Sequence, residues 1–136
     1  MDFLKLSLAG LDDFLVYFAL SALYVAVFLA IYVRVTPYRE FALIRQGNAA
    51  AAASLSGTLV GFVLPLASAV ANSVNLIDMA LWAAIALAVQ IIVYLVVRAL
   101  MPDLVRQIPE GRVGTGVFLG AASLAAGMLN AACMTY

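Results

Sequence analysis

The residues of this sequence with the clearest capacity for chemistry surround Pro65, in the middle of a long uncharged stretch. Proline has no N–H, so in a helix it leaves the carbonyl of Gly61, four residues earlier, without its hydrogen bond. Carbonyl oxygens freed in this way can hold a cation in a membrane. Ser68 follows one turn later, and Gln90 is the amide near the middle of another apolar stretch. One interpretation is therefore a polar pocket for a small solute or ion, formed by Gly61, Pro65, Ser68 and Gln90.

A second interpretation of the same residues is purely structural. Proline is tolerated in membrane helices for the shape it gives them, because neighbouring groups satisfy the freed carbonyl. A glutamine at mid-span also serves as an interhelical hydrogen-bond donor, which contributes ~0.6 kcal/mol on average in a membrane. Sequence position alone leaves both interpretations open for Pro65 and Gln90.

The residue types that enzymes and metal sites need are scarce. The chain has no histidine and a single cysteine, Cys133, which argues against Cys/His metal sites and histidine acid–base chemistry. The serines of the apolar stretches have no base beside them that would activate a nucleophile. We therefore expect a protein that is not an enzyme and that has no cofactor and no bound metal. Seven basic and seven acidic residues balance, so nothing indicates a nucleic-acid partner.

The candidate residues lie on apolar stretches that are long enough to cross a lipid bilayer. The 136 residues are 67% hydrophobic and 10% charged, with a mean hydropathy of +1.13, whereas soluble domains are about 25% charged. About 20 apolar residues cross the ~30 Å hydrocarbon core. The predicted spans are residues 14–35, 48–72, 77–100 and 113–134. We expect an all-α membrane protein with four transmembrane helices, folded as one domain over residues 1–136.

Small residues recur at steps of three and four along the second and fourth spans, and this spacing returns to one face of a helix. Between helices in lipid no hydrophobic effect drives association, and small faces let the backbones approach closely. We call the predicted set the packing seam; it consists of Gly57, Gly61, Gly116, Gly120, Ser123 and Gly127. Gly57 with Gly61, and Gly116 with Gly120, form two G-x-x-x-G motifs.

The two halves of the chain follow the same order of residues. The series Arg34, Pro37, Gly47 and Gly57 corresponds to Arg98, Pro102, Gly111 and Gly120, with shifts of 63 to 65 residues. Each half has a bulky helix, a basic amphipathic link and a helix rich in small residues. This pattern predicts two helical-hairpin repeats in the same orientation, about 14–72 and about 77–134, related by an axis along the membrane normal.

Basic residues gather at the two links, residues 36–47 and 101–112. Six of the seven basic residues lie in these links or beside them, so the links are expected in the cytoplasm and both termini outside. In the first link Arg39, Glu40 and Arg45 alternate with apolar residues. This pattern is typical of a short amphipathic segment that lies in the headgroup layer.

Three segments carry a resemblance to a known family: SGTLVG at 56–61, VLPLASA at 63–69 and LNAACMT at 129–135. With these the chain resembles the bacterial inner-membrane family called domain of unknown function 350, from the first span to the C-terminus. The resemblance implies a duplicated two-helix unit without an established activity or established functional residues. It also implies an association with envelope stress, because the family's genes often stand beside genes resembling ATP-grasp, polyamine-ligase-like and phage-shock-type proteins.

Two classes of function agree with these observations. The first is a structural or interaction module of the inner membrane, whose seams pack within the chain, against other copies or against other membrane proteins. The second is a homo-oligomeric channel or carrier for a small solute or ion, with its polar groups around Pro65. In both, the partners are the lipid bilayer and further copies of the chain.

Overall fold

The computed structural model describes residues 2–134, and all regular secondary structure in that range is helical. The helices are α1 (Asp2–Ala9), α2 (Leu11–Val35), α3 (Glu40–Arg45), α4 (Ala49–Asn72), α5 (Leu76–Leu100), α6 (Leu104–Gln107) and α7 (Val113–Cys133). Four segments are long and apolar enough to cross a membrane: α1 together with α2, α4, α5 and α7. The predicted all-α fold with four candidate membrane-spanning helices is therefore confirmed at this level.

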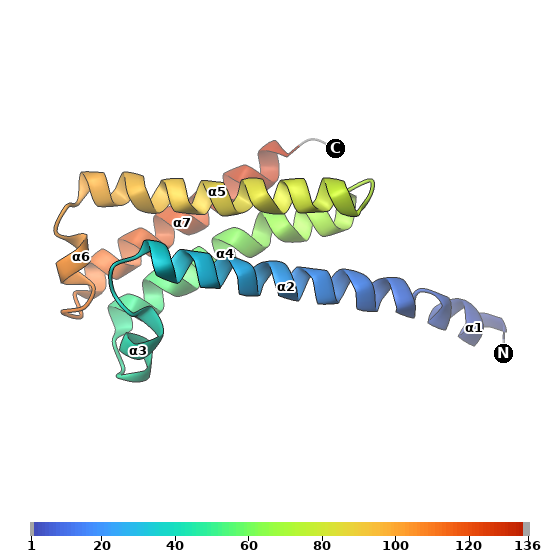
Figure 1. Cartoon of the computed structure of the whole chain (residues 1–136), viewed down its shortest axis with the longest axis horizontal. Helices are drawn as coiled ribbons and strands as arrows, with labels where there is room; N and C mark the ends of the chain where they lie inside the picture. Colours follow the sequence, from blue (N-terminus) through green and yellow to red (C-terminus); the bar gives the residue numbers. More distant parts are fainter. Residues whose placement is uncertain (1, 135–136) are drawn as a thin grey trace.

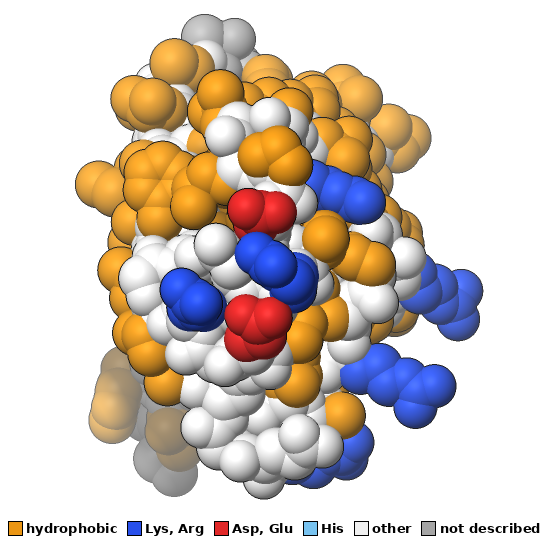
Figure 2. All heavy atoms as spheres, turned by 90° about the vertical axis from the view of Figure 1, so that its left-hand side faces the viewer, with side chains coloured by type: hydrophobic (Ala, Val, Ile, Leu, Met, Phe, Trp, Pro, Cys, Tyr) orange, Lys and Arg blue, Asp and Glu red, His pale blue; other side chains and the backbone are white. Residues whose placement is uncertain are grey.

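The four long helices alternate in direction along the chain (Figure 1). The short helices α3 and α6 lie at one end of the bundle, and the two chain ends lie at the other, together with the turn between α4 and α5. Helix α1 continues the line of α2 beyond Gly10, and none of its residues is buried. Both links are thus at the same end, and charged side chains of both signs are visible there (Figure 2).

Local signals in the sequence set the start of α4. The Asn48 side chain caps this helix by accepting a hydrogen bond from the Ala51 N–H at 3.0 Å. Its amide also donates to the carbonyl of Ile108 at 2.9 Å, so the cap holds the second link against the first. Gly47 and Gly111 have left-handed φ angles of 86° and 82°, which glycine adopts without strain. Each of these glycines turns a short helix toward the long helix that follows.

Helices α4 and α7 touch backbone to backbone. A Cβ atom on Gly57 would lie 2.2 Å from the carbonyl oxygen of Gly120, and a Cβ on Gly116 would lie 2.2 Å from that of Ala50. On the other side of the crossing, a Cβ on Gly127 would lie 2.0 Å from the carbonyl oxygen of Gly61. Real side chains do not approach backbone atoms this closely, so these positions have room for hydrogen alone.

Pro65 lies within α4 and is fully buried. It has no N–H for the carbonyl of Gly61, which in a regular helix would accept from residue 65. This carbonyl oxygen lies where a side chain on Gly127 would begin. The irregular point of α4 therefore packs directly on the glycine face of α7.

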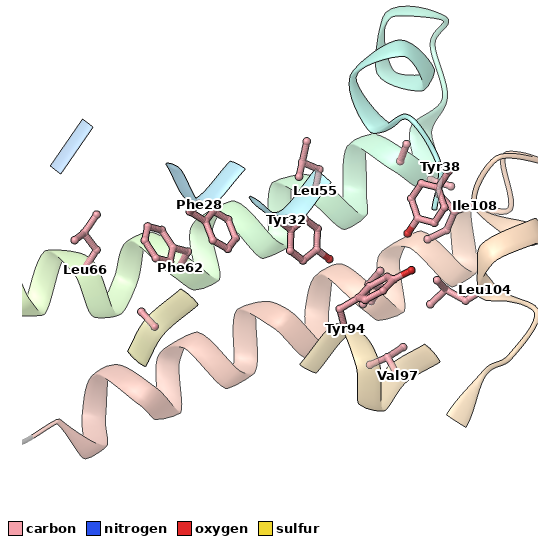
Figure 3. Close-up of a cluster of buried hydrophobic side chains, with 14 of the residues drawn as sticks. Phe28, Tyr32, Tyr38, Leu55, Phe62, Leu66, Tyr94, Val97, Leu104 and Ile108 are labelled. Carbon is pink, nitrogen blue, oxygen red and sulfur yellow. The ribbon is translucent and has the colours of Figure 1, made fainter. Parts of the chain in front are cut away.

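Helix α2 is attached to this pair by aromatic side chains. Phe28 and Tyr32 are its two buried residues. The ring of Phe28 stacks on that of Phe62 in α4, with centroids 4.2 Å apart and an interplanar angle of 3° (Figure 3). Most other side chains of α2 face outward, as apolar side chains do in lipid.

Replacement of Gly127 by alanine tests this packing. The added methyl group would overlap the Gly61 backbone, so we expect Gly127→Ala to destabilise the protein by about 1–3 kcal/mol. Gly114→Ala on the same helix is the matched control, because no atom beyond the adjoining backbone of its own helix lies within 4 Å of its Cβ position. Thermal unfolding of both variants in detergent measures the difference; equal melting temperatures would contradict backbone contact between α4 and α7.

Candidate functional site

The structure brings together part of the predicted polar pocket. Gln90 on α5 is fully buried, and its amide nitrogen donates to the carbonyl oxygen of Ser123 on α7 at 3.1 Å. A Cβ on Gly61 would lie 2.8 Å from the same nitrogen, so Gly61, Gln90 and Ser123 meet where α4, α5 and α7 join. Ser68 lies further along α4, where its carbonyl accepts from the Asn72 amide at 2.9 Å.

Three hollows of the surface lie elsewhere. One of 520 Å³, which we call the α2–α4 groove, is lined by Phe18, Ser21, Ala22, Val25, Val63, Leu66, Ala67, Val70 and Ala71. A second, of 170 Å³, lies between α2 and α5, and a third, of 270 Å³, lies at the first link. None of these three is lined by Gly61, Pro65, Ser68 or Gln90. The amide of Gln90 thus joins two helices, although its carbonyl oxygen and the Ser123 hydroxyl have no hydrogen-bond partner within residues 2–134.

A second buried polar cluster lies near the links, and sequence reasoning did not find it. Tyr32 and Tyr94 are buried, and their rings pack edge to face with centroids 5.9 Å apart. The Thr58 hydroxyl donates to the Ser54 carbonyl at 2.8 Å and lies 3.4 Å from the Tyr32 hydroxyl. These hydroxyl groups come from α2, α4 and α5, so the cluster joins three of the long helices.

Tyr38, in the first link, completes the cluster. Its hydroxyl and that of Tyr94 point toward one another (Figure 3). The guanidinium group of Arg98, near the end of α5, also interacts with the Tyr94 hydroxyl. Tyr38 also packs with Leu104 and Ile108 of the second link, so the cluster lies where the two links meet the bundle.

Glu40 departs from the amphipathic pattern predicted for the first link. The prediction grouped it with Arg39 and Arg45 as a charged residue of that segment, but its side chain is buried, with 1% exposed. The Thr36 hydroxyl, four residues earlier, donates to its carboxylate. Burial raises the pKa of Glu40 to about 7, and the hydrogen bond from Thr36 partly opposes this rise. The first link therefore turns its carboxyl group inward and leaves its arginines outside.

This arrangement can take up and release a proton near neutral pH. The polar groups around Glu40 include the hydroxyl groups of Thr36, Tyr32, Tyr38 and Tyr94. No three side chains of the types His, Cys, Asp and Glu gather into a metal-binding group in the described residues. The signal available in the sequence is Thr36, four residues before Glu40, but the segment between them is not helical and the spacing alone does not bring the two side chains together.

Comparison with known proteins gives the family. Residues 5–134 match the family described as Domain of Unknown Function (DUF350). The chain belongs to the DUF350 family. Two relatives, the inner membrane protein YjfL of Escherichia coli strain K12 and its counterpart in Escherichia coli O157:H7, are each 44% identical over 129 residues. These alignments cover 95% of this chain and 98% of each relative. No solved structure matches the chain.

The segments that carry the resemblance to DUF350 lie in α4 and at the end of α7. SGTLVG and VLPLASA belong to α4 and include Gly57, Gly61 and Pro65. LNAACMT covers the end of α7 through Met134, and its last residue, Thr135, lies outside the described residues. The family description assigns no activity.

The raised pKa of Glu40 predicts how stability depends on pH. The folded state binds the Glu40 proton more tightly than the unfolded state, so folding is favoured at low pH. Stability should fall as pH rises from about 4.5 to about 7 and then level off. The full change in the free energy of unfolding is on the order of 3 kcal/mol, at about 1.36 kcal/mol for each unit by which the pKa differs between the folded and unfolded states. The chain has no histidine, whose ordinary pKa would also fall in this range.

Thermal unfolding of the parent, Glu40→Gln and Glu110→Gln across this pH range measures the effect. We expect Glu40→Gln to lose the dependence, because the amide is neutral throughout. Glu110→Gln should keep it, since Glu110 is half exposed on the second link. A pH dependence that persists unchanged in Glu40→Gln would show that another group causes it.

Proposed function

We propose that this DUF350 protein is a multi-pass protein of the bacterial inner membrane with a structural or interaction role, and that it is not an enzyme. The observation that carries the proposal is the use of its mid-membrane polar groups for packing. The amide of Gln90 donates to α7, and the carbonyl of Gly61 lies against Gly127. The name of the relative YjfL supports the inner membrane, and the resemblance to the family supports an association with envelope stress.

Glycine packing of the G-x-x-x-G kind supports a rigid scaffold. The approach of α4 to α7 at Gly57, Gly61, Gly116 and Gly127 fixes the two helices against each other. The direction of the helices supports the duplicated hairpin, since α2 and α5 run one way and α4 and α7 the other (Figure 1). In this proposal the α4–α7 pair is the core of the module, and α2 and α5 present its outer faces to partners.

Self-association is the second part of this proposal. The α2–α4 groove, with a volume of 520 Å³, is open on its outer side and almost entirely apolar. Phe18 lines it and is 64% exposed. Such a surface has to be covered by acyl chains or by protein, and a second copy brings an apolar helix of matching length in its own α2.

Oxidative cross-linking in native membranes tests self-association. In a Cys133→Ser background, we expect Ala22→Cys, which lines the groove, to form disulfide-linked dimers. Ala121→Cys is the matched control, because it is also an exposed alanine near the middle of its helix but lies on α7. Equal cross-linking at both sites, or monomer alone at both, would contradict a dimer through the groove.

The orientation proposed for the chain places the links in the cytoplasm and both termini outside. Six arginines at the link end support it. In the Cys133→Ser background, we expect Val74→Cys, in the outer turn, to react with an impermeant maleimide on spheroplasts. Gln46→Cys, in the first link, should react after the membrane has been permeabilised. Both residues are exposed, so the reverse pattern would invert the topology.

A channel or carrier remains the second candidate, and one observation favours it. The carbonyl oxygen of Gln90 and the hydroxyl of Ser123 are buried at mid-span without hydrogen-bond partners in the described residues. Unsatisfied groups of this kind line solute pathways in transporters. In this reading Pro65 keeps the Gly61 carbonyl free, and Pro65→Ala would close the path.

Flux measurements in proteoliposomes separate the two candidates. We expect the parent protein and Pro65→Ala to give the same K⁺, Na⁺ and H⁺ flux as protein-free vesicles, because the polar groups lie within helix contacts. Flux in the parent that is lost in Pro65→Ala, with the oligomer unchanged, would replace the structural role by transport.

A further inference from the structure

The hollow at the first link combines positive charge with apolar surface. It has a volume of 270 Å³ and is lined by Val33, Arg39, Glu40, Phe41, Ala42 and Arg45. Val33 belongs to the last turns of α2, Arg39 precedes α3, and Arg45 ends it. The hollow therefore lies just beyond the end of a membrane-spanning helix, at the depth where lipid headgroups begin.

The two arginines of this hollow lack a carboxylate partner in the described residues. The ion pairs among the described residues all lie in the second link. They join Arg106 to Asp103 at 3.7 Å, Arg106 to Glu110 at 3.8 Å and Arg112 to Glu110 at 3.9 Å. At this end of the molecule, red groups adjoin blue groups near the centre of the view, and other blue groups at the edge have no visible red neighbour (Figure 2).

Glu40 does not neutralise the arginines of its own link. Its carboxyl group is buried and accepts a hydrogen bond from the Thr36 hydroxyl. Arg39 and Arg45 are exposed and line the same hollow, so an anion bound there would be attracted by both positive charges. The guanidinium fork of arginine matches the oxygens of a phosphate group, to which it can donate two parallel hydrogen bonds.

The apolar part of the hollow decides between a free anion and a lipid. Phe41 is 48% exposed, and together with Val33 it forms an apolar wall beside the arginines. An apolar wall adds nothing to the binding of a free phosphate ion. A phospholipid, by contrast, carries acyl chains directly below its phosphate, and these can pack against such a wall. Anionic lipids also attract basic residues near the membrane surface by about 1 kcal/mol per residue.

We propose that this hollow binds the phosphate group of an anionic phospholipid, with Arg39 and Arg45 donating to the phosphate oxygens and with Val33 and Phe41 against the upper acyl chain. The site depends neither on self-association nor on which face of the membrane is cytoplasmic. It distinguishes the first link from the second, whose arginines are already engaged by Asp103 and Glu110.

Titration of the detergent-purified protein with dioleoylphosphatidylglycerol, followed by native mass spectrometry, tests the proposal. We expect tight binding of one lipid in the parent and binding about 25-fold weaker in Arg39→Gln/Arg45→Gln, at about fivefold per arginine. Arg106→Gln/Arg112→Gln removes the same net charge from the second link and should bind like the parent. Arg39→Lys/Arg45→Lys keeps the charge without the fork and should bind with intermediate affinity, which provides a measurement if the glutamine variant does not fold.

Two further titrations separate a lipid site from other causes. Dioleoylphosphatidylcholine should bind more weakly than the phosphatidylglycerol in the parent, and millimolar inorganic phosphate should not compete with it. Equal weakening in both glutamine variants would show diffuse attraction to arginines in general and overturn the proposal. Unchanged binding in Arg39→Gln/Arg45→Gln, or displacement of the lipid by inorganic phosphate, would overturn it as well.

Discussion

The backbone contact between α4 and α7 is the constraint on which the other helices depend. In lipid there is no hydrophobic effect to draw two apolar helices together, so dispersion and backbone contacts have to supply the attraction. Gly57 and Gly127 show how little room remains, because the first atom of a side chain would overlap the opposite backbone. The other two spans are then placed by this pair: α5 through the hydrogen bond of Gln90, and α2 through the stacking of Phe28 on Phe62.

The same contact gives Pro65 a structural context. A proline inside a helix leaves one carbonyl without its donor, and in lipid such a carbonyl is costly unless protein covers it. Here the carbonyl belongs to Gly61 and lies against Gly127, where a side chain would exclude it. The irregular point of α4 therefore meets α7 at a position where the close backbone of Gly61 leaves no room for a side chain.

The parts of the fold that could be predicted from the sequence follow from periodicity and hydropathy. A span needs about 20 apolar residues, and a small face needs steps of three and four, so both are visible in one sequence. The place of Glu40 follows from neither rule. It depends on how the chain turns between α2 and α3, which brings the Thr36 hydroxyl to its carboxylate and Tyr38 to Tyr94. Contacts between a link and three helices leave no local pattern in the sequence.

The two links show that similar sequences can reach different electrostatic states. The second link keeps Asp103 and Glu110 outside, where they pair with its arginines. The first link buries its one carboxyl group among hydroxyls and leaves Arg39 and Arg45 uncompensated. A neutral helix bundle thus carries an end that is balanced on one side and cationic on the other. The α2–α4 groove offers apolar surface, whereas this asymmetric end offers exposed positive charge.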